Sequence, residues 1–307
     1  MRRLLITGPT GFIGAHCLAR LLASDFEEID AVNRGGTGPG GDRVRWHAAD
    51  LRDPVAAAAL IHQVRPTHVL HGAWIATPGV YWQARENLDW LAASLALIRA
   101  FGETAGQRFV GVGSSAEYDP TEEPCREDAT RLRPASIYGQ CKLACSIGLG
   151  AAARSYGFSS AWARVFLPYG PGDPPQRLVP SVLASLRAHR PIALSAGTQI
   201  RDFIYAPDAA DLLARLVHSP ATGAFNVCSG EGVSIRTALE TLADVVGVRN
   251  CLQFGAIAMR PGEPQVLVGC TDKVRETLGW HAPTSLDEGL AIVCRTEQVS
   301  APSKVSG

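Results

Sequence analysis

The stretch "RRLLITGPTGFIG", Arg2–Gly14, decides the fold of this 307-residue chain. A short apolar run, Leu4–Thr7, leads directly into three glycines spaced three residues apart, and an amphipathic segment, residues 14–24, follows. A strand, a glycine-rich turn and a helix in this order let backbone N–H groups approach a pyrophosphate at the helix N-terminus. We therefore predict a dinucleotide-binding turn that is formed by Gly8, Thr10, Gly11, Phe12, Ile13 and Gly14.

Short apolar strands alternate with amphipathic helices beyond this turn. The strand-like segments are residues 2–8, 28–34, 67–74, 108–115 and 159–166, and the helical segments between them include residues 53–65, 86–106 and 136–157. Parallel strands need crossover connections of about ten residues or more, which are usually helices. The pattern predicts an α/β protein with a Rossmann-type, doubly wound parallel sheet.

The second strand ends in "AVNRGG", where an acidic residue would ordinarily bind the ribose 2′-hydroxyl of NAD. Asn33 and Arg34 stand there instead, and a guanidinium at this place can pair with the 2′-phosphate of NADP. This favours NADP(H) as the cofactor and leaves NAD(H) open. Asp50 and Leu51 follow the third strand, where they are expected to flank the adenine.

The alternation becomes irregular after about residue 165, where Pro and Gly gather in "LPYGPGDPP". We expect a dinucleotide-binding domain at 1–165, with residues 202–228 returning to it. Residues 166–295 would form mainly a smaller α/β substrate-binding domain, and residues 296–307 a flexible tail.

Composition and charge narrow the class of protein. Lys plus Arg and Asp plus Glu balance at 29 each, so no basic surface suggests a nucleic-acid or membrane partner. No apolar run approaches the ~18 residues of a membrane span, and we expect a cytoplasmic protein. The eight cysteines form no C-x-x-C pair, so neither a metal site nor a disulfide framework is predicted.

Several short motifs in order complete the pattern. The chain resembles the extended short-chain dehydrogenase/reductase family, in its branch of NAD(P)-dependent nucleotide-sugar epimerases, dehydratases and reductases. The resemblance covers nearly the whole chain and is carried by "TGPTGFIG", "ADL", "HGAW" at His71–Trp74, Asn87, "GSSAEY" at Gly113–Tyr118, "YGQCK", "RVFLPYGPG", "RDFIYAPDAAD" and "TDKVRETLGW".

The resemblance gives a role to Tyr138 and Lys142, which lie one helical turn apart on one face. It implies that Tyr138 is the general acid/base and that Lys142 binds the nicotinamide ribose and stabilises the phenolate. A phenol with a pKa of ~10 is a poor base at neutral pH unless a nearby cation favours its ionised form. The resemblance also implies that Ser115 hydrogen-bonds the reacting sugar oxygen beside Tyr138.

Further site residues are implied by the same motifs. Gly72, Ala73, Trp74 and Asn87 would contact the cofactor, and Ser114, Glu117 and Tyr118 the sugar. Arg177, Arg201 and Arg260 would clamp the substrate diphosphate, because guanidinium groups bind phosphate with bidentate, charge-assisted hydrogen bonds.

The expected function is reduction of a nucleotide-linked 4-keto-6-deoxy hexose, with Tyr138 as proton donor. An alternative is a 4-epimerase that retains NAD, and a remote one is a cofactor-sensing protein without catalysis. The 4,6-dehydratases of this branch carry Thr-Asp-Glu where this chain has Ser115, Ala116 and Glu117, so dehydration would lack its acid at 116. The resemblance also implies a homodimer through a four-helix bundle of helices 86–106 and 135–156.

Overall fold

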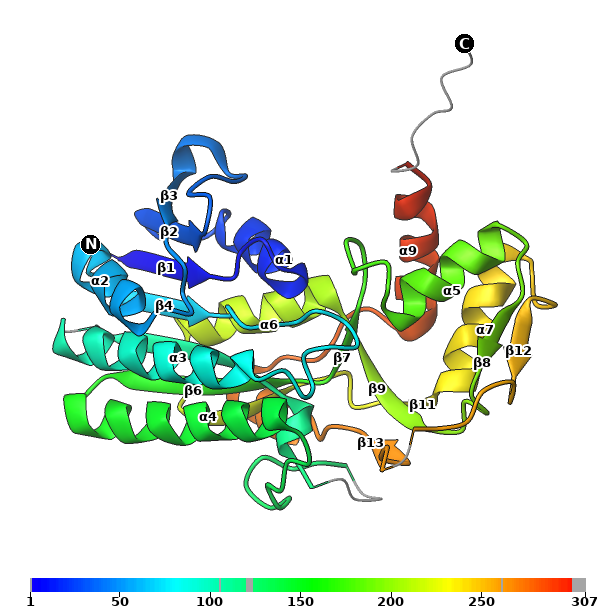
Figure 1. Cartoon of the computed structure of the whole chain (residues 1–307). Coiled ribbons are helices and arrows are strands. Elements are labelled where there is room, and N and C mark those ends of the chain that lie inside the picture. The colour runs from blue at the N-terminus through cyan, green and yellow to red at the C-terminus, as the bar shows by residue number, and fades with distance from the viewer. Residues whose placement is uncertain (1, 105, 120–123, 261, 300–307) are drawn as a thin grey trace, which may run out of the picture.

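The structure, a computed structural model, describes residues 2–104, 106–119, 124–260 and 262–299 and shows two lobes (Figure 1). The larger lobe is built on a seven-stranded parallel sheet of order β10-β6-β5-β4-β1-β2-β3. Its strands are β1 (Arg3–Thr7), β2 (Glu28–Asn33), β3 (Val44–Ala48), β4 (His68–His71), β5 (Arg108–Ser114), β6 (Ser159–Val165) and β10 (Gly223–Val227). The predicted doubly wound sheet is confirmed.

Helices cover both faces of this sheet. One face carries α1 (Phe12–Leu21) and α6 (Ala206–His218), and the other carries α2 (Pro54–Val64), α3 (Glu86–Glu103) and α4 (Ile137–Tyr156). Alternate residues of β1 serve the two faces, as the period of a strand requires. Leu4 and Ile6 pack with Leu18 of α1, whereas Leu5 packs with Ile61 of α2. Two short 3₁₀ turns, η1 (Gly41–Arg43) and η2 (Ser115–Glu117), complete this lobe.

The smaller lobe has two short sheets and its own apolar core. β7 (Leu167–Tyr169), β9 (Ile200–Tyr205), β11 (Gly232–Ser234) and β13 (Val266–Leu267) form one sheet, and β8 (Ile192–Leu194) pairs with β12 (Leu252–Phe254). Its helices are α5 (Leu178–Arg187), α7 (Ile235–Val246) and α9 (Leu286–Val299). Leu183, Leu239 and Leu290 bring these three helices together in one core.

The chain passes between the lobes more often than the sequence pattern suggests. Within the segment 202–228, α6 and β10 lie on the large sheet, whereas residues 202–205 finish β9 in the smaller lobe. The short helix α8 (Asp272–Leu278) also returns, because Val274 and Trp280 are buried in the core of the larger lobe. Residues 296–299, predicted to lie in a flexible tail, continue α9; residues 300–307 lie outside the described part of the chain.

Two features of the described residues bear on the class of protein. No helix among them is long and apolar enough to cross a membrane. All eight cysteines are buried as free thiols, and no group of three or more His, Cys, Asp or Glu in the described ranges is arranged to hold a metal ion.

Candidate active site

The glycine-rich turn joins β1 to α1 at the centre of the sheet, where the strand order reverses. Gly8 has a φ of 73°, and a Cβ on it would lie 2.8 Å from the backbone nitrogen of Ala73. A Cβ on Gly14 would lie 1.9 Å from the Gly8 carbonyl oxygen. The turn therefore packs backbone against backbone, and only glycine fits at these two positions. Helix α1 begins at Phe12 and leaves its first N–H groups free of intrahelical partners.

A buried polar chain fixes the end of β4 beside this turn. The Thr7 hydroxyl accepts from the Ala73 N–H (3.1 Å) and shares a hydrogen bond with His71 Nδ1 (2.8 Å). His71 Nε2 continues the chain to the Ser94 hydroxyl (2.8 Å). Burial, with a smaller effect of the Lys142 charge, lowers the pKa of His71 to about 3. The ring is therefore neutral and serves as a spacer between β4 and α3.

The end of β2 forms a tight loop around Asn33. The Asn33 side-chain oxygen accepts from the N–H groups of Gly35 and Gly36 (2.9 and 2.7 Å), and its amide nitrogen donates to the Thr37 carbonyl. Asn33 thus orders the loop with both ends of its amide. Arg34 is exposed on the loop that Asn33 orders.

Asp50 and Leu51, the residues expected at the adenine, point in different directions. Arg52 hydrogen-bonds the Asp50 carboxylate (2.6 Å) and lowers the pKa of that group to about 2, with a small contribution from Arg34. Leu51 is 6% exposed and belongs to the core beneath α2. Only Asp50 therefore presents its side chain at the edge of the sheet.

Helix α4 begins directly against η2, and this contact places Tyr138. The Ser136 hydroxyl caps the helix by accepting from the Gly139 N–H (3.1 Å). A Cβ on Gly139 would lie 2.4 Å from the Ala116 carbonyl oxygen, so the two segments touch through backbone. Burial raises the pKa of Tyr138 to about 12, and the side chain of Ser114, the last residue of β5, opposes that rise.

The role predicted for Ser115 beside Tyr138 stays a prediction, and the structure offers the preceding serine as a second candidate. Ser114 ends β5 and its side chain acts on the pKa of Tyr138, whereas Ser115 starts η2 and is only 8% exposed. The Ser115 carbonyl accepts from the Tyr118 N–H (3.1 Å) within the turn. Because the chain leaves the strand between the two serines, their side chains face different surroundings.

Lys142 lies one turn after Tyr138 and is almost fully buried. Its Nζ donates to the Val112 carbonyl (2.7 Å) and lies 4.0 Å from the Trp74 ring centre and 6.0 Å from the Tyr138 ring centre. Burial lowers the pKa of Lys142 to about 8. The Trp74 indole N–H donates to Asn87 Oδ1 (2.8 Å), so both predicted cofactor residues help to hold the aromatic ring over the ammonium.

Two aromatic residues that sequence analysis did not assign to the site pack against Tyr138. The Tyr81 and Trp82 rings meet the phenol edge-on, with centroid distances of 4.8 and 5.7 Å. The Tyr138 N–H also donates to the Trp82 carbonyl (3.3 Å). The signal in the sequence was the pair of adjacent aromatic residues in the loop after β4. Such a pair alone does not show whether the side chains line a binding site or pack in the core.

Arg177 and Arg260 face this aromatic cluster from the smaller lobe. Arg177 precedes α5, donates to the Pro168 carbonyl (3.0 Å) and is ion-paired with the buried Asp173 (3.2 Å). It opposes the rise in pKa of Tyr138 that burial causes. Arg260 is exposed, and together with Arg177 it opposes the burial that raises the pKa of Tyr81. Of the predicted clamp arginines, Arg177 therefore acts on both Tyr138 and Tyr81, and Arg260 acts on Tyr81.

Arg201 is the third, and like Arg177 it already has a carboxylate partner. Its guanidinium, buried on β9, donates to Glu263 (2.9 Å) and to the Ile200 carbonyl (2.8 Å). Gln199, which directly precedes β9, donates to the other oxygen of Glu263 (3.2 Å). Glu263 would have to share Arg201 with any phosphate that binds there.

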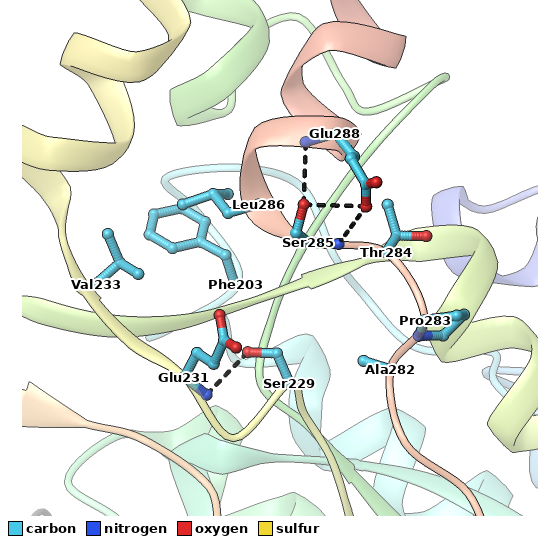
Figure 2. Close-up of a pocket in the computed structure, with 10 residues that line it drawn as sticks. All are labelled: Phe203, Ser229, Glu231, Val233, Ala282, Pro283, Thr284, Ser285, Leu286 and Glu288. Carbon is cyan, nitrogen blue, oxygen red and sulfur yellow. Dashed lines mark hydrogen bonds between the residues drawn. The ribbon is translucent and has the colours of Figure 1, made fainter.

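A separate cavity of about 170 Å³ lies in the smaller lobe, between β9, β11 and the start of α9 (Figure 2). Its charged lining residues are Glu231 and Glu288, and Glu288 accepts from the Ser285 hydroxyl and N–H (3.0 Å each). None of the predicted catalytic or clamp residues lines it. An acidic lining does not suit a diphosphate, so this cavity is not a candidate for the nucleotide.

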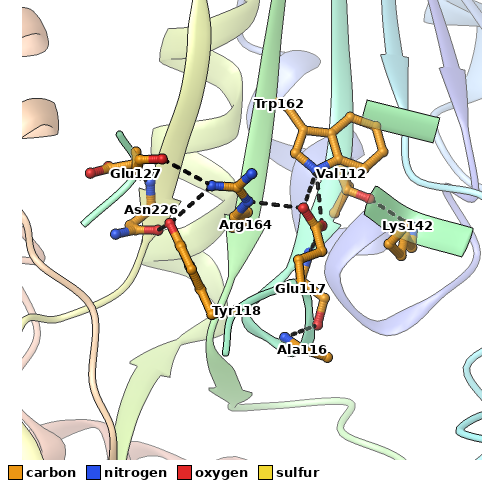
Figure 3. A network of polar contacts seen from close by, with 10 residues as sticks. Val112, Ala116, Glu117, Tyr118, Glu127, Lys142, Trp162, Arg164 and Asn226 are labelled. Atoms are coloured by element: carbon orange, nitrogen blue, oxygen red, sulfur yellow. Dashed lines mark hydrogen bonds and ion pairs between the residues drawn. The ribbon is translucent and has the colours of Figure 1, made fainter. Parts of the chain in front are cut away.

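Glu117 and Tyr118 hold their polar atoms in a buried network (Figure 3). The Glu117 carboxylate is fully buried and accepts from Trp162 Nε1 (2.9 and 3.1 Å) and Arg164 Nε (2.9 Å). The Tyr118 hydroxyl donates to Asn226 (2.7 Å) and accepts from Arg164 (3.1 Å). The prediction that these two side chains touch the sugar is therefore not met, because their polar atoms are enclosed by protein.

The structure combines a glycine-rich turn for a dinucleotide with a Tyr-x-x-x-Lys helix on one doubly wound sheet. This is the arrangement of a short-chain dehydrogenase/reductase, and this chain is an enzyme of that class. It belongs to the NAD dependent epimerase/dehydratase family, whose model matches residues 4–228. The family resemblance predicted from the motifs is thereby confirmed.

Relatives in this family match the chain almost end to end. UDP-glucose 4-epimerase of Azospirillum brasilense is 30% identical, with 91% of this chain and 86% of the relative covered. The structure of Thermus thermophilus UDP-glucose 4-epimerase in complex with NAD superposes with a TM-score of 0.87 at 25% identity, covering 97% of this chain and 100% of that one. MoeE5 in complex with UDP-glucose and NAD gives 0.85 at 27% identity, covering 97% and 99%.

Proposed function

We propose that the protein is a nucleotide-sugar 4-epimerase, which removes and returns hydride at one carbon of the sugar and keeps NAD bound throughout. The observation that carries the proposal is the Lys142 ammonium, 6.0 Å from the centre of the Tyr138 ring, together with the Ser114 side chain that acts on the same phenol. A hydroxyl next to a phenol offers two groups that can both reach one sugar oxygen. The names of the relatives favour UDP as the nucleotide.

The side chains account for proton transfer at that oxygen. In the unliganded protein, Tyr138 has a pKa of about 12 and is therefore protonated at neutral pH, which suits donation to a ketone. The reverse step needs the phenolate, and positive charge beside the ring favours it. Lys142 supplies such a charge, since its pKa of about 8 leaves it mostly protonated at pH 7. Ser114 would orient the sugar oxygen toward the phenol.

The residues around the glycine turn fit a dinucleotide. Gly8 and Gly14 let the turn pack backbone against backbone, and the N-terminus of α1 would present its N–H groups to a pyrophosphate. When bound there, the nicotinamide would accept and return the hydride. Asn87 and Trp74 would shape its ribose end through the contact with Lys142.

Arg177 and Arg260 are proposed to bind the diphosphate of the substrate. They approach the Tyr138 cluster from the smaller lobe, so a diphosphate between them would leave its sugar beside the phenol. Charge-assisted hydrogen bonds from guanidinium to phosphate are among the strongest that side chains make. Arg201 would contribute only if Glu263 moves or shares it.

A 4-ketoreductase that consumes NADPH is the second candidate, and Arg34 is the observation that favours it. Arg34 is exposed beyond the end of β2, where it could meet a 2′-phosphate, and no acidic residue stands in the place that would select NAD. A dehydratase is not proposed. With Ser114 as the partner of Tyr138, the next residues are Ser115 and Ala116, and neither carries an acid.

One experiment separates these two reactions. The purified protein would be denatured and its supernatant assayed for released NAD, and the native protein would be given UDP-glucose alone. Released NAD and appearance of UDP-galactose support the epimerase. Release of no cofactor, together with loss of NADPH absorbance when a nucleotide-linked 4-keto sugar is added, supports the reductase. Retention of either activity by Tyr138→Phe would contradict both reactions.

We also propose that the protein forms a homodimer through α3 and α4. The two helices pack side by side, and Leu88 and Leu95 on α3 and Ile147 on α4 are exposed. Exposed apolar side chains gathered on neighbouring helices are typical of a surface that a partner covers. A second copy would add its own pair of helices and close a four-helix bundle.

A further inference from the structure

A charged pair lies buried directly behind the proposed catalytic residues. Glu117 is 0% exposed and Arg164 is 3% exposed, and their side chains meet at 2.9 Å (Figure 3). Removing two charges from water is costly, and replacing a buried ion pair with apolar residues is often neutral or stabilising. Stability of the fold is therefore a weak explanation for the buried Glu117–Arg164 pair. Its position behind the proposed catalytic residues suggests a role in the reaction instead.

The Glu117 carboxylate is joined to Ser114 through the backbone. The Ser114 N–H donates to Glu117 Oε1 (2.9 Å), and the Ser114 hydroxyl accepts from the Ala116 N–H (3.2 Å). These reciprocal bonds form a capping box that closes η2 at the end of β5. The Ser114 side chain also acts on the Tyr138 phenol, where it opposes the rise in pKa that burial causes. One carboxylate thus sets the position of the residue that acts on the acid/base.

The strand leaves space for this carboxylate by carrying a glycine. A Cβ on Gly113 would lie 2.5 Å from Glu117 Oε1 and 2.2 Å from Trp162 Nε1. Glycine weakens a strand interior and often marks a close approach of other groups. The Glu117 carboxylate therefore lies against Gly113, where a side chain would collide with it, and is held there by Trp162 and Arg164.

We propose that Glu117 is a positioning residue for the reaction: its carboxylate, held by Trp162 and Arg164, fixes Ser114 against Tyr138. The inference rests on the proposed function, in which Tyr138 transfers the proton. Glu117 does not touch the substrate; it acts through Ser114.

The charge of Glu117 also shifts the pKa values of Tyr138 and Lys142. It raises the pKa of Tyr138 and of Lys142, in each case less than burial shifts that group. Besides the Trp82 ring, the polar and charged groups that act on the phenol or lie near it are Ser114 and Glu117 from β5 and η2, Tyr81 from the loop after β4, Arg177 from the smaller lobe and Lys142 from the same helix. Of these, Glu117 is the only carboxylate in the described part of the chain that shifts the phenol.

The test is a set of variants measured with the cofactor-loaded protein. Glu117→Gln removes the charge and replaces one of the two accepting oxygens with an NH2 group, so Gln cannot accept from both Ser114 and Arg164. We expect kcat to fall roughly tenfold, the equivalent of one misplaced hydrogen bond, with KM unchanged. The pKa of Tyr138, followed by NMR of 13Cζ-labelled tyrosine, should fall, because a negative charge is lost and Arg164 is left unpaired. Glu127→Gln is the matched control, since Glu127 is a buried carboxylate of the same network that accepts from Asn226 (2.8 Å) and is not bonded to Ser114.

A double-mutant cycle with Ser114→Ala decides whether Glu117 acts through Ser114. If it does, Glu117→Gln in the Ser114→Ala background has little further effect on kcat. Additive losses, or an unchanged kcat and tyrosine titration in folded Glu117→Gln, would overturn the proposal. Should Glu117→Gln not fold, Trp162→Phe removes one donor to the carboxylate and should still lower kcat; an unchanged kcat there also overturns it. Full activity of Tyr138→Phe would instead refute the proposed function.

Discussion

The Lys142 ammonium lies 4.0 Å from the centre of the Trp74 ring and donates its hydrogen bond to the Val112 carbonyl, with no carboxylate bonded to it among the described residues. A buried cation with an aromatic ring and a carbonyl as its partners is stabilised only in part. The lowered pKa of Lys142, about 8, is the result. Such a group costs stability and is expected where function requires it.

Lys142→Met should therefore stabilise the fold at pH 7 while abolishing turnover. Methionine has a similar length and no charge to bury, so the unfavourable desolvation disappears. We expect a higher thermal midpoint than that of the unaltered protein, measured by calorimetry without cofactor. Lys273→Met, which removes a lysine ion-paired to Asp128 at the surface, is the control and should change the midpoint little. A lower midpoint for Lys142→Met would contradict the argument.

The same lowered pKa predicts how stability depends on pH. Between about pH 8 and the usual lysine pKa of 10.5, the unfolded chain binds a proton at Lys142 that the folded chain does not. The free energy of unfolding should therefore rise with pH across this window through this group. Comparing urea unfolding of the unaltered protein with that of Lys142→Met isolates the contribution, because the difference between the two should narrow as pH increases.

The rate of ketone reduction should fall over the pH range in which the free energy of unfolding rises. Tyr138, with a pKa of about 12, stays protonated through this range, whereas Lys142 loses its charge near pH 8. In the direction of ketone reduction, kcat/KM is expected to decline above pH 8 as the ammonium is lost. A profile that is flat from about pH 7 to pH 10 would show that the lysine charge does not enter the rate.

The sequence was informative where the chemistry depends on local spacing. The glycine turn follows one strand directly, and Tyr138 and Lys142 share a face because they are one turn apart, so neither needs knowledge of distant contacts. The choice between Ser114 and Ser115 depends on where β5 stops and η2 starts, which a capping interaction decides. No pattern in the serines themselves shows that boundary.

Glu117 could not be placed from the sequence for a different reason. A carboxylate at the end of a central strand has the usual position of a site residue. Its burial is decided by Trp162 and Arg164 of β6, which are more than forty residues away in the chain and provide three hydrogen bonds. The same holds for Arg201, whose pairing with Glu263 joins two segments of the smaller lobe.

The substrate clamp gives a further prediction. Arg177→Ala and Arg260→Ala should each raise KM for the nucleotide sugar roughly 10- to 100-fold, as expected for loss of a charged hydrogen bond. Because the phosphate contacts are equal in the ground and transition states, kcat should change much less. Arg249→Ala removes an exposed arginine paired with Asp244 and serves as the control. An unchanged KM in both clamp variants would place the diphosphate elsewhere.

The proposed dimer can be tested at Ile147, which is 65% exposed on α4 although it is apolar. A carboxylate at this position would be harmless on a free surface, where it would be solvated, and costly inside a four-helix bundle, where two copies would face each other near the symmetry axis. Ile147→Glu is therefore expected to convert a dimer into a folded monomer, measured by light scattering coupled to gel filtration. Val55→Glu, on the exposed face of α2 at 76% exposure, is the matched control and should leave the molar mass unchanged. If the unaltered protein is itself monomeric, or if Ile147→Glu remains dimeric, α3 and α4 do not form the interface.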